Sequence, residues 1–143
     1  MTSTNVADLY LQKALSKHLT NMTPTMSIAW ENTNFTPTNG IAHLETWLLP
    51  IPTQPITLGP SYWEEFSGIF QVTCVYPAGR GTNDAKTKAA AIKTRFKRGT
   101  SFTYNTLTVK IREAYPESGY YSEDGIWYRV PCSIVYLAYA NNE

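Results

Sequence analysis

The sequence predicts an α+β fold: a small, single-layer, mixed but mostly antiparallel β-sheet with two helices packed on one face. Two segments carry apolar residues at helical spacing, and several others alternate apolar and polar residues. These segments follow one another as helix, strands, helix, strands, an order typical of an α+β layer. The chain of 143 residues contains no linker or internal repeat, so we expect one domain over residues 1–143.

The first helix is predicted to begin at Asn5, which can cap it, and to end near Asn21, because Pro24 follows. Asp8 lies in its first turn, where the helix dipole favours an acid. His18 lies beside the apolar stripe, and we interpret it as a partly buried structural histidine rather than a ligand. The stripe consists of Ala7, Leu11, Leu15, Leu19 and Met22.

The second helix is predicted over Asn83–Arg98, with Thr82 or Asn83 as its cap. Gly99 suits the left-handed residue that commonly ends a helix. Lys88 and Arg95 flank one side of a narrow apolar stripe formed by Ala85, Ala89, Ile92 and Phe96. The other flank carries Lys86, Lys93 and Lys97. These charges indicate a solvated face, a contact with DNA phosphates or a contact with an acidic partner.

Strands are predicted from alternating and β-branched segments. Pro131, inside the last of them, predicts an edge position or a bulge, because proline provides no ladder donor. Four prolines at 50–60 exclude a central strand there and favour a proline-rich arm at about 50–62, either an ordinary surface loop or a projection that contacts another chain. The predicted strands are Ile28–Glu31, Ile41–Leu49, Phe66–Tyr76, Leu107–Arg112 and Ile126–Tyr139.

No group of residues has the spacing of a catalytic, metal or cofactor site. His18 and His43 lie in unrelated segments, and Cys74 and Cys132 fit reduced core cysteines that could pair only if their strands are neighbours. The turn around Arg80 lacks the pattern of a phosphate loop. We therefore expect no catalytic residues, no metal, no cofactor and no enzyme activity.

Composition excludes several classes of protein. Hydrophobic residues make up 43% of the chain and the net charge is only +1, which argues against disorder and against general nucleic-acid binding. No apolar run is long enough for a membrane span, and two cysteines favour a reducing compartment. Only 16% of residues are charged while 13% are aromatic, which is typical of a surface reserved for assembly.

Several segments together resemble the tail terminator (tail completion) proteins of long non-contractile-tailed bacteriophages. The resemblance extends from Val6 to Tyr139 and rests on glycine positions, alternating strands and a Trp-Tyr pair. The segments that carry it are 68–81 (GIFQVTCVYPAGRG), Ala85–Phe96 with Gly99, 107–111 (LTVKI) and 124–136 (DGIWYRVPCSIVY).

The resemblance implies a virion structural protein with a small α/β sheet, helices on one side and no catalytic residues. Such proteins form a ring, usually a hexamer, on the completed tail tube, stop its polymerisation and offer a surface for head joining. The implied partners are other copies of the chain, the major tail tube protein and the head completion or connector protein, with DNA only passing through the lumen. The implied location is the head-proximal end of the virion tail, after assembly in the host cytoplasm.

Two surfaces are predicted to serve assembly, because aromatic residues are enriched and charges depleted in interface cores. The predicted subunit or partner interface comprises Ile51, Ile56, Leu58, Tyr62, Trp63, Tyr115, Tyr120 and Tyr121. The basic residues predicted to face the lumen or a partner are Arg80, Lys86, Lys93 and Lys97. Two alternatives remain open: another phage neck or head–tail connector protein, and a small nucleic-acid-binding module that uses the basic helix 83–98.

Overall fold

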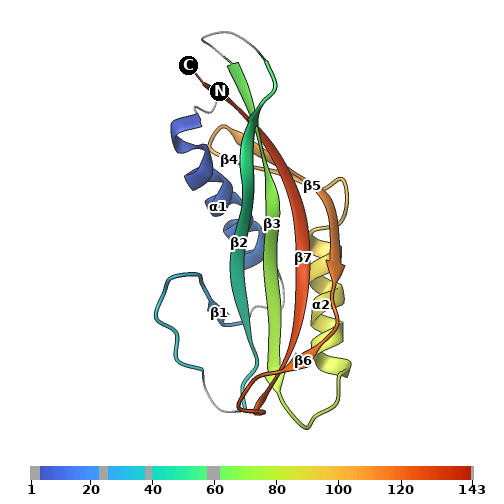
Figure 1. Ribbon diagram of the computed structural model, residues 1–143. Helices are drawn as coiled ribbons and strands as arrows, with labels where there is room; N and C mark the ends of the chain where they lie inside the picture. The colour runs from blue at the N-terminus through green and yellow to red at the C-terminus, as the bar shows by residue number, and fades with distance from the viewer. Residues whose placement is uncertain (1–3, 23–25, 38–39, 58–61, 143) are drawn as a thin grey trace.

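The structure is a computed structural model that describes residues 4–22, 26–37, 40–57 and 62–142 (Figure 1). Its strands form one sheet in the order β1-β2-β3-β7-β5-β4, with β6 also paired to β7. Only the short β1–β2 pair is parallel, so the predicted mixed, mostly antiparallel sheet is confirmed. The elements are α1 (Thr4–Thr20), β1 (Ile28–Ala29), β2 (His43–Pro55), β3 (Tyr62–Pro77), α2 (Asn83–Arg95), β4 (Ser101–Tyr104), β5 (Leu107–Pro116), β6 (Tyr120–Tyr121) and β7 (Trp127–Asn142).

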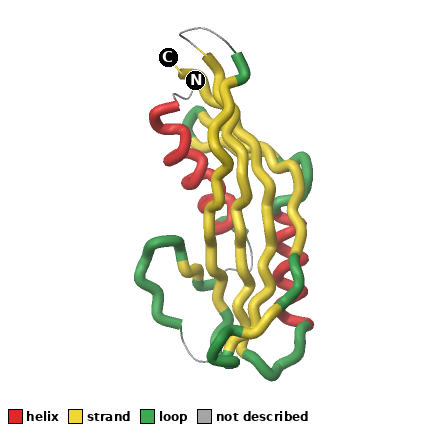
Figure 2. The backbone as a smooth tube through the Cα atoms, in the orientation of Figure 1, coloured by secondary structure: helices red, strands yellow, loops and turns green. Residues whose placement is uncertain are grey.

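Both helices cover the same face of the sheet (Figure 2). The even-numbered residues of β3 and β7 share that face, because Val72 pairs with Cys132, and they form one core cluster with the buried residues of both helices. The predicted stripes of both helices are buried, including Leu15 and Phe96. In the described part of the chain, the other face of the sheet carries no helix.

The two helices also contact each other near their C-terminal ends. The Arg95 Nε–H donates to the His18 carbonyl over 3.0 Å, and His18 Nε2 lies 3.0 Å from the Arg95 carbonyl oxygen. The His18 ring stacks on Phe102 with 4.3 Å between centroids. Burial lowers the pKa of His18, so the ring serves as a partly buried structural residue, as predicted.

The ends of both helices differ from the prediction. Helix α1 begins at Thr4, so Asn5 lies inside its first turn rather than at its cap. Helix α2 ends at Arg95 instead of Arg98, because the chain turns there toward β5, where the Gly99 amide donates to the Ile111 carbonyl. Gly99 has the expected positive φ of 89° in this turn.

The five predicted strands are present, and most are longer than predicted. The edge position or bulge predicted from Pro131 is wrong, because β7 is a central strand between β3 and β5, and the register shift of its β5 pairing lies elsewhere. The Pro131 carbonyl accepts from the Glu117 amide, so its missing amide donor also points toward that side. On that side β5 ends at Pro116, opposite Cys132, and β6 begins at Tyr120, opposite Arg129. Pro131 therefore lies opposite the gap between β5 and β6, and its missing amide costs no hydrogen bond of the sheet.

Candidate subunit interface

The arm, residues 50–62, is the distal part of the β2–β3 hairpin. Figure 1 shows the two strands continuing to the end of the molecule where the chain termini lie. The Ile56 amide donates to the Trp63 carbonyl over 2.9 Å, and the Trp63 amide donates to Thr57 Oγ1 over 2.8 Å. All described arm residues on the β2 side, 50–57, are exposed. The arm is therefore ordered by its backbone and buries little side-chain surface of its own.

The three described prolines of the arm lie along its outer edge. The Leu48 amide points away from β3, since it donates to Glu31 Oε1 over 2.8 Å, and alternate residues beyond it point the same way. A register shift between Ile51 and Gln54 then reverses the alternation, and the Ile56 amide points toward β3. The residues that face outward without an amide donor are Pro50, Pro52 and Pro55. Such an edge resists the addition of another strand, so contacts of the arm must come mainly from side chains.

The predicted arm residues present apolar surface where the structure describes them. Ile51 is 52% exposed and Ile56 is 49% exposed, whereas Trp63 is half-buried. Leu58 lies outside the described residues, and the side chain of Tyr62 does as well.

The three predicted tyrosines are exposed toward the same end of the sheet, and we call them the tyrosine patch; Tyr120 and Tyr121 pair with successive residues of β7 and therefore point to opposite faces. Tyr115, Tyr120 and Tyr121 are 38%, 50% and 65% exposed. The loop between Pro116 and Tyr120 is fastened to the sheet, because the Glu117 carboxylate accepts from the Ser133 hydroxyl over 3.0 Å. The patch is thus held by the fold and available to a partner.

The arm and the tyrosine patch do not come together. Glu65, at the base of the arm, pairs with Tyr139 of β7, whereas Tyr120 pairs with Arg129 of the same strand. At about 3.3 Å per residue, these two positions on β7 lie roughly 33 Å apart. Each copy of the chain therefore presents two separate and different surfaces.

The helix-free face of the sheet between these surfaces is also apolar, which the sequence reasoning missed. Trp47, Leu49 and Tyr139 on this face are 53%, 43% and 41% exposed. The sequence does contain a sign of this surface, because Trp47, Leu48 and Leu49 are consecutive apolar residues and so lie on both faces of the strand. A strand with one face in water normally has apolar residues on one face only.

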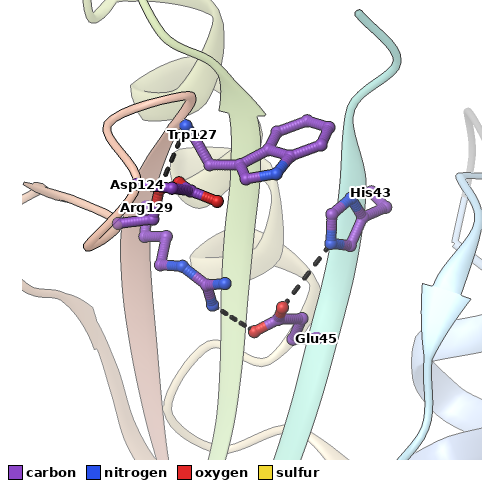
Figure 3. A network of polar contacts seen from close by, with 6 residues as sticks. His43, Glu45, Asp124, Trp127 and Arg129 are labelled. Atoms are coloured by element: carbon purple, nitrogen blue, oxygen red, sulfur yellow. Dashed lines mark hydrogen bonds and ion pairs between the residues drawn. The ribbon is translucent and has the colours of Figure 1, made fainter. Parts of the chain in front are cut away.

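A partly buried polar cluster lies on this face, away from the arm (Figure 3). The Glu45 carboxylate of β2 bonds to the Arg129 guanidinium of β7 and lies 3.5 Å from Nε2 of the buried His43. The His43 ring meets Trp127 edge-on, with 5.2 Å between centroids. The cluster joins β2 to β7 across β3. Its residues pair with one another and pack against aromatic rings, an arrangement that suits a structural role.

The basic residues of α2 divide into two groups. Lys86, Lys93 and Lys97 are exposed, as is Arg80 in the preceding turn. Lys88 flanks the apolar stripe as predicted, but it does not belong to a solvated face, since it is only 6% exposed and its burial lowers its pKa. Its long aliphatic stem is covered where α2 packs on the sheet. Arg95 on the same flank is bound to α1, so this side of the helix is structural.

The described residues contain no group of three or more His, Cys, Asp or Glu that could hold a metal ion. Cys74 and Cys132 are free and buried, and burial raises the pKa of each thiol to about 12. Such thiols are unreactive core residues. In the described part of the chain, neither helix is both long and apolar enough to cross a bilayer.

Comparison with known proteins identifies the family. A family model described as "Phage tail terminator protein" matches residues 10–136. One solved structure is similar with a TM-score of 0.71 and 26% identity, over 95% of this chain and 95% of its own. No curated protein matches the sequence. Since the family model covers most of the chain and the observed fold agrees with the fold expected for it, the chain belongs to the phage tail terminator protein family and is a structural protein of phage tail assembly.

Proposed function

We propose that this protein forms a closed ring of six copies that caps the completed tail tube at its head-proximal end. The ring binds the last ring of tube subunits, prevents the addition of the next one and presents a new surface to the head completion or connector protein. Membership of the family places the protein in the virion tail, with tail and head components as its partners. The proposal adds the ring, the cap and the joining surface.

The observation that carries the proposal is the presence of two different exposed apolar regions, whose partner positions on β7, Tyr139 and Arg129, lie roughly 33 Å apart. A two-fold dimer buries the same patch on both copies, whereas a ring requires two unlike patches on each copy. The arm supplies one apolar surface at one end of the sheet, and the tyrosine patch supplies an aromatic surface near the other. This arrangement suits head-to-tail association between copies and leaves surface for partners above and below the ring.

The mechanism is steric and requires no chemistry. A tube subunit adds to the surface exposed by the previous ring, and a bound terminator ring covers that surface. Its own outer face differs from that of the tube, so polymerisation stops there. The lumen of the ring stays open for DNA, and the exposed Lys86, Lys93, Lys97 and Arg80 are the basic side chains proposed to face this lumen or the tube.

Imaging of the purified protein by negative stain, with mass measurement by light scattering, tests the ring. Rings of one size with a central hole support the proposal, and a monomer at all concentrations contradicts it. Tail tube protein polymerised in vitro should then give tubes that stop growing when the rings are added. Rings that leave tube length unchanged but bind the head connector would instead favour another neck protein.

Replacement of Trp63 and Tyr121 by alanine should weaken the ring while the monomer stays folded, because both residues lie in the proposed interface surfaces. Replacement of Ile41 by alanine is the matched control, since Ile41 is 57% exposed and lies outside both surfaces. Rings that form equally well in all three variants would exclude this interface assignment.

The competing class, a nucleic-acid-binding module, depends on the exposed lysines of α2 and of the turn that follows it. It predicts a mobility shift with duplex DNA at low salt that disappears when Lys86, Lys93 and Lys97 are replaced by glutamine. We expect no such shift, and ring formation should be unaffected by the triple replacement. A salt-sensitive shift by a monomeric protein would favour the DNA-binding module over the ring.

A further inference from the structure

A groove of about 470 Å³ lies on the helix-covered face of the sheet, between α1 and the base of the arm. One wall is the first half of α1, with Asp8 and Leu9, and the other wall is β2 with the arm residues 50–53. Figure 1 shows α1 beside this part of β2. We call this hollow the arm groove, and its lining is mostly apolar.

The floor of the arm groove holds a hydroxyl group without a partner. Tyr136 of β7 lines the groove and is fully buried, and its hydroxyl forms no hydrogen bond within the described residues. Gly68 of β3 lets the hydroxyl reach the groove wall, because a Cβ atom there would lie 2.7 Å from the hydroxyl and 2.9 Å from the Pro50 Cα. A buried hydroxyl without a partner destabilises the isolated chain, and a group that bonds it on assembly removes that cost.

The lining of the arm groove selects the chemistry of an occupant. Leu9 and Ile51 are 51% and 52% exposed and offer apolar surface for a side chain to cover. Asp8 is exposed and is the only charged residue among the described lining residues, so the groove repels a phosphate or a carboxylate. The best fit is an apolar side chain with a neutral polar tip that donates to Asp8 and accepts from Tyr136. Tyrosine combines these properties, whereas lysine and tryptophan only donate.

The orientation of copies in the proposed ring determines which surface meets the arm groove. Neighbouring copies in a ring of six differ by a rotation of about 60°, so the same face of each sheet points in nearly the same direction. A groove on the helix-covered face of one copy is then met by the helix-free face of the next. The exposed lysines of α2 lie on the helix-covered side and are therefore directed away from it.

The tyrosine patch, the surface proposed to meet the arm, has two members on the helix-free face. Tyr115 and Tyr120 pair with odd-numbered residues of β7, which alternate with the buried core residues of that strand. Tyr120 is the more exposed, at 50% against 38%, and its β7 partner lies further from the arm. Tyr121 points to the helix-covered face and packs on Tyr128 with 5.4 Å between ring centroids, which holds β6 on β7 and so positions Tyr120.

We propose that Tyr120 of each copy inserts into the arm groove of the next copy, where its hydroxyl bonds to the Tyr136 hydroxyl and to the Asp8 carboxylate; the inference rests on the ring proposed above. The contact joins two unlike surfaces of the chain, as a closed ring requires. It gives the buried Tyr136 hydroxyl a partner in the assembled state. It also agrees with the expected weakening of the ring by Tyr121→Ala, because loss of the Tyr121 ring loosens the strand that carries Tyr120.

Removal of single hydroxyl groups tests the contact. Tyr120→Phe and Tyr136→Phe each remove one hydroxyl and keep the aromatic group, and each should raise the concentration at which half of the protein is in rings by about three- to tenfold. The double variant should be little worse than either single variant, because both hydroxyls belong to one hydrogen bond. The matched control is Tyr139→Phe, which removes an exposed hydroxyl from the same face at the arm end and should leave ring formation unchanged.

Tyr136→Phe also separates the contact from folding. Its hydroxyl has no partner within one copy, so the variant monomer should unfold at a higher urea concentration than the wild type while its rings form less readily. A residue with a purely structural role would shift both measurements in the same direction.

The outcomes separate this inference from the ring itself. If wild-type protein forms no ring, the proposed function fails, and this inference fails with it. If wild-type rings form and either Tyr120→Phe or Tyr136→Phe assembles as readily as the wild type, or if their effects add in the double variant, the insertion of Tyr120 into the arm groove is wrong. If Tyr136→Phe rings form normally but no longer stop tube growth, the groove binds a tube subunit, which also overturns the inference.

Discussion

Replacement of Gly68 by alanine should destabilise the base of the arm. Gly68 is buried and pairs with Pro50 of β2 and with Tyr136 of β7. A Cβ atom at this position would lie 2.5 Å from the Leu49 carbonyl oxygen, 2.7 Å from the Tyr136 hydroxyl and 2.9 Å from the Pro50 Cα. Two of these three atoms belong to the backbone of a paired strand, so the clash cannot be relieved by rotation of a side chain.

The size of the effect follows from this geometry. Overpacking of a well-packed site costs about 1–3 kcal/mol, and we expect about 3 kcal/mol because backbone must move. For a chain of this size each kcal/mol corresponds to about 2–4 °C, so the melting temperature should fall by roughly 10 °C. Urea unfolding followed by circular dichroism measures the change, at two concentrations at which the protein is monomeric, because assembly would add to the apparent stability.

A second replacement checks the cause of the clash. Adding Tyr136→Phe to Gly68→Ala removes the hydroxyl contact but leaves the two backbone contacts, so the double variant should recover only part of the loss. A Gly68→Ala protein with a free energy of unfolding within about 0.5 kcal/mol of the original, the range of a neutral surface change, would refute the reasoning.

Three further outcomes are expected. Tyr136→Phe alone should raise the free energy of unfolding by about 1 kcal/mol, because the Tyr136 hydroxyl is buried without a hydrogen-bond partner; a loss of stability in urea would contradict this. The pKa of His18 is lowered from 6.5 by burial, so the unfolded chain binds a proton that the folded chain resists as the pH falls below 6.5. Stability should therefore fall from pH 7 to about pH 5, and His18→Gln should flatten this slope in pH-dependent unfolding. Cys74 and Cys132 should resist a thiol reagent in the native protein at pH 8 and react fully in urea, since burial raises each pKa to about 12; rapid native labelling would show that the thiols are accessible.

Sequence periodicity located the elements because it depends only on neighbouring residues. Ala85, Ala89 and Ile92 repeat at helical spacing, and Leu107, Val109 and Ile111 alternate, so each segment had one face to bury. Both sets are buried in the structure. The edge position predicted from Pro131 was wrong for a related reason. The sequence shows that proline lacks an amide donor, but it does not show which segment of a neighbouring strand lies opposite the proline.

The candidate site was only partly accessible to sequence reasoning. The prolines and exposed apolar residues of the arm are visible as residue types, and so are the tyrosines. The hollow lined by Arg98, Lys110 and Arg112 at the β4–β5 edge was not predicted, because Arg98 follows one element while Lys110 and Arg112 belong to another. A pairing such as that of Glu45 with Arg129 is likewise invisible, since 84 residues separate the two partners in the chain.

The sequence by itself determined the fold class, the residues that form the core and the composition of the assembly surfaces, since these follow from local periodicity and from residue chemistry. The tertiary structure decided where those surfaces lie. The order of the strands puts the arm at one end of the β2–β3 pair, and the register of β7 separates the arm from the tyrosine patch. The physical reason is that strand order and register arise from contacts between distant segments, which no local pattern encodes.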